Sequence, residues 1–261
     1  MGEDRVKLTA FQLRTVALME AMPRLHSTHC FRSAMHHLER AERLVVEDPA
    51  MAIFRAITAE EEAASGLIRC VAELKYPKAN LLNPRDHIHK HAVFPFMEVV
   101  QLFVAQSFAD HFQSFKLHIK EESGRTLLML ALDVKVDGQV TLAYPIPPLN
   151  FGMKNRDSHE PINYSYQINQ LIGARGGDSI KAFLKAEANV RNRILYAGPS
   201  GYPEVEEVNK SFIDTRRKRV LSLLNLYLLI APHEEHQPFV SQVIDSFVSV
   251  LNEVRHTSRK S

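Results

Sequence analysis

Apolar residues recur at helical spacing from Phe11 to Tyr76. One such stretch runs through FQLRTVALMEAM, and a second begins at Ser27 or Thr28, both of which are good residues for capping a helix. Asp48 and Pro49 then restart the pattern, with the aspartate as cap and the proline in the first turn. We therefore expect three consecutive helices before residue 77.

The pattern predicts a further, largely buried helix and then a change of period. Residues 83–120 resume helix after Pro84 and are rich in phenylalanine, with a kink expected at Pro95. Residues 126–136 alternate instead, and Asp137-Gly138 is typical of a two-residue hairpin turn leading into residues 140–144. This predicts a small β-hairpin inserted among helices.

The second half of the chain returns to helix after a loop. Residues 145–161 are rich in proline and turn formers, and helical spacing follows at 164–172, 178–196, 204–231 and 238–255. There is no internal repeat. We predict a mainly α, single-domain protein spanning residues 1–261, in which the helices on both sides of the hairpin share one core.

Composition fits an ordinary folded protein and argues against a disulfide-rich, secreted or membrane-spanning one. Hydrophobic residues make up 45% of the chain, and the formal charge of +2 requires that any nucleic-acid binding come from a local patch. Cys30 and Cys70 lack metal-binding or disulfide-framework spacing, which favours reduced thiols. The first residues do not resemble a signal peptide, and the longest apolar stretch, at 220–231, is shorter than a membrane span of about 20 residues. We expect a cytoplasmic protein with no membrane partner.

Two adjacent carboxylates lie where the third helix should be apolar. Glu61 follows Ile57 by four positions and precedes Ala64 by three, so it falls on the core-facing stripe, and Glu60 borders that stripe. A buried carboxylate must be paired or hydrogen-bonded. The sequence favours a structural carboxylate, either hydrated or paired with an arginine, over a catalytic one.

The helix expected at 178–196 carries a second polar stripe. Glu187 precedes Arg191 by one turn, which is the favourable order for an intrahelical ion pair. Arg191 offers a permanently charged fork for phosphate, with Asn192 beside it and the hydroxyl of Tyr196 one turn further along. The pair could equally be an ordinary solvated contact.

Two histidines share a helix face, and one dense basic run follows later. His87 and His91 are four residues apart, as in many metal-binding pairs, but the chain specifies no third ligand, so we predict no metal. The basic run is a solvated helical face by default and a phosphate contact if the protein handles RNA. Its members are Arg216, Arg217, Lys218 and Arg219. The chain holds no phosphate-binding loop, hydrolase elbow or zinc-protease motif.

Three runs together resemble the AbiV-like abortive-infection proteins, which are grouped with the HEPN superfamily. They are AMHHLERAERLVVEDPAMAIFRAITAEEEAASGLIRC, RDHIHKH and VRNRILYAG, which fall in the family's order within residues 27–200. The usual HEPN signature is Arg-x4–6-His with a polar residue after the arginine. Arg191 and Asn192 match it, whereas Tyr196 stands where histidine would be, and tyrosine is a poor base at neutral pH.

The resemblance implies a HEPN-like helical bundle, with the hairpin as an insertion and additional C-terminal helices. It also implies a phage-defence protein that binds or cleaves RNA as a homodimer, without metal or cofactor. Arg191 would bind the phosphate, and His87 or His91 would supply the missing base. The residues predicted to share this site are Arg191, Asn192, Tyr196, Glu61, Glu60, His87 and His91.

Two other readings stay open. In the first, the chain is not an enzyme but a helical interaction or sensing protein with a protein partner, and Glu61 and Arg191 form a structural pair. A weaker reading is a metal-dependent helical enzyme that uses His87, His91 and one of the two glutamates.

Overall fold

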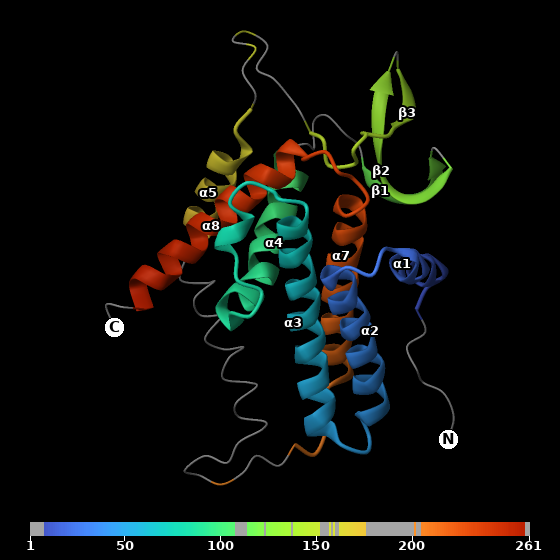
Figure 1. Ribbon diagram of the computed structural model, residues 1–261, viewed down its shortest axis with the longest axis vertical. Coiled ribbons are helices and arrows are strands. Elements are labelled where there is room, and N and C mark those ends of the chain that lie inside the picture. The colour runs from blue at the N-terminus through green and yellow to red at the C-terminus, as the bar shows by residue number, and fades with distance from the viewer. Residues whose placement is uncertain are drawn as a thin grey trace. The chain divides into compact units, whose positions relative to one another are not determined.

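The computed structural model describes residues 8–107, 114–122, 124–136, 138–151, 157, 159, 162–175, 201 and 205–258. These residues are mainly helical and include one small antiparallel sheet (Figure 1). The predicted mainly α class with a β-hairpin is therefore confirmed.

The elements follow one another along the chain with the following bounds. The helices are α1 (Ala10–Ala21), α2 (His26–Leu44), α3 (Pro49–Glu73), α4 (His87–Ser107), α5 (Tyr164–Arg175), α7 (Lys210–Ile230) and α8 (Pro238–Ser258), with a short 3-10 helix η1 (Ala79–Leu81). The strands are β1 (Phe115–Glu122), β2 (Arg125–Val136) and β3 (Gln139–Ala143).

The helix starts show which capping predictions hold. The Asp48 carboxylate accepts a hydrogen bond from the Met51 amide at 3.0 Å, which confirms it as the cap of α3. The prediction for α2 was wrong, because its cap position is Leu25 and Ser27 and Thr28 lie inside the first turn. The Thr28 hydroxyl donates to the Pro23 carbonyl at 2.7 Å and lies 2.8 Å from the Tyr227 hydroxyl. Thr28 is fully buried, so its hydroxyl makes these tertiary hydrogen bonds and does not cap the helix.

The sheet has one strand more than predicted. Residues 115–122 form β1, which pairs antiparallel with β2, and β2 pairs antiparallel with β3. The predicted helix to residue 120 was therefore wrong beyond α4. Phe115, Leu117 and Ile119 alternate with polar residues, which is the period of a strand, and β2 supplies their backbone partners.

The contacts divide the chain into two compact units. Unit 1 comprises Met1–Arg69, Pro84–His91 and Leu184–Tyr227, and unit 2 comprises Cys70–Asn83, Ala92–Phe183 and Leu228–Ser261. The prediction that they form a single domain stays a prediction. No described helix is long and apolar enough to cross a membrane.

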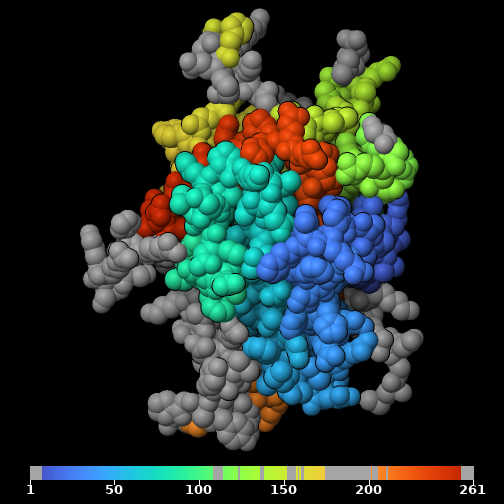
Figure 2. All heavy atoms as spheres, in the orientation of Figure 1, coloured from blue at the N-terminus to red at the C-terminus, as the bar shows by residue number. Residues whose placement is uncertain are grey.

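Unit 1 is built on three long helices, α2, α3 and α7, that lie side by side (Figure 1). Phe31 of α2 is fully buried, and its ring centroid lies 4.6 Å from that of Tyr227 in α7. A Cβ atom at Gly66 of α3 would lie 2.8 Å from the Phe31 ring, so the glycine permits this close approach. The side chains of α1 and α2 adjoin on one face of the unit (Figure 2).

Unit 2 contains the sheet and a core of aromatic rings. Phe239 of α8 makes edge contacts with Tyr164 of α5 and with Phe151, at centroid distances of 5.7 and 5.3 Å. The side chain of Gln237 accepts a hydrogen bond from the Leu149 amide and donates one to the Leu229 carbonyl. These buried contacts fix the start of α8.

Candidate functional site

The two adjacent glutamates of α3 face different helices. Successive residues of an α-helix are about 100° apart around its axis. Glu60 contacts arginines of α7, whereas Glu61 contacts the first turns of α4. Both are buried, which confirms the expectation that they lie against the core.

Glu61 is held by three basic side chains from one face of α4. Its Oε1 atom lies 3.1 Å from His87 Nδ1 and 3.1 Å from His91 Nε2, and its Oε2 atom accepts a hydrogen bond from Lys90 Nζ at 2.7 Å. Positions i, i+3 and i+4 of a helix project to the same side, so the spacing of these three residues produces the cluster. His87 is 55% exposed, whereas His91 and Lys90 are buried.

Local contacts fix the start of α4 against α3. The Asp86 carboxylate accepts a hydrogen bond from the Ile88 amide at 2.8 Å, which caps the helix. Ser65, one turn beyond Glu61, donates from its hydroxyl to the Pro84 carbonyl at 3.0 Å. The segment entering α4 is thus tied to α3 beside the cluster.

The Glu61 carboxylate sets which ring nitrogen of each neighbouring histidine acts as a donor to it. Burial raises the pKa of Glu61, but hydrogen bonds from His91 and Lys90 and their charges outweigh it and hold the pKa well below its usual range. An ionised carboxylate only accepts hydrogen bonds. In their neutral forms, His87 therefore carries its proton on Nδ1 and His91 on Nε2. This leaves Nε2 of a neutral His87 as the ring's proton acceptor.

Glu60 forms a second buried cluster. Its carboxylate pairs with Arg216, and its Oε1 atom lies 3.3 Å from Arg219 Nη1. The Arg216 guanidinium also lies 4.6 Å from the centre of the Phe212 ring. The partners are one turn apart on α7, so both can reach the same carboxylate.

The basic run of α7 is mostly engaged with carboxylates. Arg217 is buried and contacts Glu42 at 2.8 Å and Asp214 at 2.7 Å. The expectation of a solvated basic face was therefore wrong for Arg216 and Arg217, because acidic residues of α2, α3 and α7 neutralise them in the core. Lys218 is exposed. The proposed RNA contact by this run stays a prediction.

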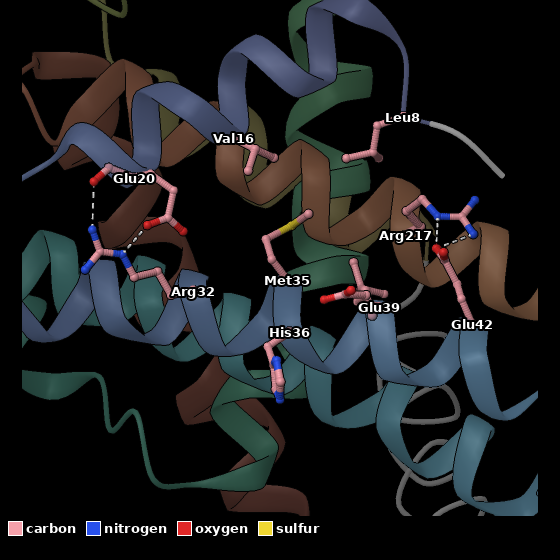
Figure 3. A pocket seen from close by; sticks show the side chains of 10 residues that line it. Leu8, Val16, Glu20, Arg32, Met35, His36, Glu39, Glu42 and Arg217 are labelled. Atoms are coloured by element: carbon pink, nitrogen blue, oxygen red, sulfur yellow. Dashed lines mark hydrogen bonds and ion pairs between the residues drawn. The ribbon is translucent and has the colours of Figure 1, made fainter. Parts of the chain in front are cut away.

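An open pocket of about 380 Å³ adjoins the Arg217 pair (Figure 3). Its ion pairs are Arg217 with Glu42 and Arg32 with Glu20, the latter at 2.8 Å. The lining combines apolar and charged side chains, namely Leu8, Val16, Glu20, Arg32, Met35, His36, Leu38, Glu39, Glu42 and Arg217. Three carboxylates against two arginines do not favour a phosphate ligand.

Three predicted site residues lie outside the described residues. They are Arg191, Asn192 and Tyr196, and the Glu187–Arg191 pair lies there as well. The predicted contact between Arg191 and either buried glutamate is thus untested.

Sequence reasoning brought together Glu61, His87 and His91 but missed Lys90 as their neighbour. It also missed Glu42 as a partner of the basic run. A signal was present for the lysine, which lies on the same helical face as the two histidines. The ligand atoms of Glu61, His87 and His91 all lie within 4.8 Å of one another, so this group could hold a metal ion.

Comparisons with known proteins identify no relative. The chain matches no family model, no curated protein and no solved structure.

Proposed function

We propose that this protein is a HEPN-like, phage-defence-associated cytoplasmic protein that binds and cleaves RNA without a metal, as a homodimer. The support is the motif resemblance together with the cluster around Glu61. Both cysteines are buried thiols, which suits a reducing compartment.

The observation that carries the proposal is the contact of one ionised carboxylate with two histidines. Glu61 accepts from His87 and so fixes the tautomer in which Nε2 can take a proton. A carboxylate behind an imidazole also stabilises the imidazolium that forms. The HEPN-like motif lacks its histidine, and His87 supplies this group from another helix.

The proposed reaction is cleavage by the RNA's own 2′-hydroxyl. His87 Nε2 takes the proton of that hydroxyl, whose oxygen attacks the adjacent phosphorus. The bond from phosphorus to the 5′-oxygen breaks, and that oxygen receives a proton. The products are a cyclic 2′,3′-phosphate and a free 5′-hydroxyl, so the step consumes no water.

Residues of the Arg191 motif complete the proposed site. Arg191 binds the scissile phosphate and stabilises its developing charge. Asn192 orients the phosphate, and Tyr196 donates the proton to the 5′-oxygen. His91 and Glu60 are positioning residues, since both are buried in ion-pair clusters.

Defined RNAs incubated with wild type and Arg191→Ala in EDTA test the proposal, with thermal melts of both proteins alongside. We expect cleavage by wild type alone, with both proteins equally folded. Absence of cleavage by wild type, or equal cleavage by the variant, would refute it.

A second candidate is a non-catalytic helical interaction or sensing protein. The observation that favours it is the Glu60 cluster, in which the buried Glu60–Arg216 ion pair joins α3 to α7. Under this reading Glu61 and Arg191 are structural, so neither wild type nor Arg191→Ala cleaves RNA, and Arg191→Ala melts far below wild type.

A further inference from the structure

We propose that Glu61, His87 and His91 bind a divalent transition-metal ion of the Zn²⁺ class. All three residues lie in unit 1, Glu61 on α3 and the two histidines in the first turns of α4, and the hydrogen bond from Ser65 to the Pro84 carbonyl ties the segment entering α4 to α3. The binding itself does not depend on the proposed RNA cleavage.

The distances match those of a metal coordination shell. With bonds of about 2.0–2.1 Å, two ligand atoms of a tetrahedral zinc ion lie roughly 3.3 Å apart. Glu61 Oε1 lies 3.1 Å from both His87 Nδ1 and His91 Nε2. All three ligand atoms lie within 4.8 Å of one another, so only small side-chain shifts are needed.

The donor set selects the class of ion. Two imidazoles and one carboxylate are typical of zinc sites that keep a fourth position for water, and imidazole also suits copper, nickel and iron. Magnesium and calcium require mainly oxygen ligands, and this cluster offers a single carboxylate. The exposed side chain of His87 provides a path for the ion.

Lys90 orients the Glu61 carboxylate without occupying the oxygen atom proposed as the metal ligand. Its ammonium bonds to Glu61 Oε2, so Oε1 remains the atom shared with the histidines. Ligating carboxylates are commonly held by such an outer hydrogen bond. The ammonium also repels a dication, which should keep the affinity moderate.

Metal binding would oppose the proposed catalysis, and this consequence rests on the proposed function. A metal on His87 Nδ1 requires the ring proton to move to Nε2. The nitrogen that would accept the 2′-hydroxyl proton is then already protonated. Zn²⁺ should therefore inhibit RNA cleavage, and EDTA should restore it.

Calorimetric titration with Zn²⁺, and absorption spectra with Co²⁺, test the site in the absence of RNA. The comparison is between wild type, His87→Ala, His91→Ala and the matched control His29→Ala, an exposed histidine of α2. We expect one ion per chain in wild type and the control, with a Co²⁺ spectrum showing nitrogen and oxygen ligands. His87→Ala and His91→Ala should each bind the ion at least about 100-fold more weakly, since losing a group that only hydrogen-bonds to a metal ligand already costs 10–100-fold in affinity.

Two outcomes would overturn the proposal. One is the absence of a one-to-one site in wild type, and the other is unchanged affinity in His87→Ala, which replaces a largely exposed side chain and should fold normally. Because no RNA is present, failure of metal binding is distinguishable from failure of the proposed cleavage. Binding without any effect on cleavage would leave the site standing and refute only the inhibition.

Discussion

Replacing Glu60 by a neutral residue should lower the free energy of unfolding more than neutralising an exposed charge does. In Glu60→Gln the side chain keeps its size, but Arg216 loses its counter-charge while remaining in the core. The Glu60 and Arg216 side chains are 1% and 5% exposed, so water cannot replace the lost partner. Breaking a buried pair by removing one member costs about 3–5 kcal/mol. That is a large part of a total stability of about 5–15 kcal/mol.

Urea unfolding followed by circular dichroism would measure this loss. The matched control is Glu39→Gln, because Glu39 pairs with Arg43 where both side chains are 58% exposed, and such pairs contribute about 0–1 kcal/mol. Replacing Glu60 and Arg216 together by Met should recover most of the loss, since the buried Arg216 charge is removed with its partner, and Arg219, which also pairs with Glu60, is 22% exposed and can be hydrated. A free energy of unfolding for Glu60→Gln within about 1 kcal/mol of that of the control would refute the reasoning, because exposed pairs contribute roughly 0–1 kcal/mol.

Three further predictions concern unit 1. Gly66→Ala places a Cβ atom 2.8 Å from the Phe31 ring, and a clash of about 1–3 kcal/mol should exceed the gain of about 1 kcal/mol in helix propensity, so its melting temperature should fall. Thr28→Val removes the hydroxyl that contacts Tyr227 and should cost about 1 kcal/mol in urea unfolding, whereas Thr28→Ser should cost less because it keeps that hydroxyl. Burial raises the pKa of Glu61, but hydrogen bonds and nearby positive charges lower it more, so its stabilisation is present above the ordinary pKa of 4.5 and is lost as the pH falls. Thermal melts at pH 5 and pH 3, a window set by that ordinary pKa of 4.5, should therefore show a smaller loss of stability in Glu61→Gln than in wild type. An equal loss in the two proteins would contradict the assignment of this pH dependence to Glu61.

Burial of the two glutamates was predictable, and so was a site shared by Glu61, His87 and His91, but Lys90 and the particular arginines that pair with Glu60 were not. The apolar stripe of α3 places Glu61 against the core from spacing alone. Which arginines Glu60 meets depends on the helix packed beside α3, and chain order does not specify that packing. Glu60 thus pairs with Arg216, which lies 156 positions away.

The basic run illustrates the same limit. Four consecutive cationic residues favour a solvated face in a single helix. Burial of Arg216 and Arg217 depends on Glu60 and Glu42, which belong to two other helices. Local pattern cannot supply such distant counter-charges.

The start of the sheet was missed for a different reason. Phenylalanine density across 94–115 suggested continued helix, although Phe115, Leu117 and Ile119 already alternate. The strand needed pairing with β2 to be stable, and the Ser123-Gly124 turn signal between the two strands was overlooked.

Cleavage of a defined RNA in EDTA by wild type, His87→Ala and His29→Ala tests the central claim most directly. If His87, oriented by Glu61, is the base, His87→Ala should lose roughly 100-fold or more of the rate, as general acid–base catalysis contributes about 10²–10⁴-fold. The His29→Ala control should cleave like wild type, with all three proteins melting alike. Equal rates for wild type and His87→Ala, or no cleavage by wild type, would contradict the account.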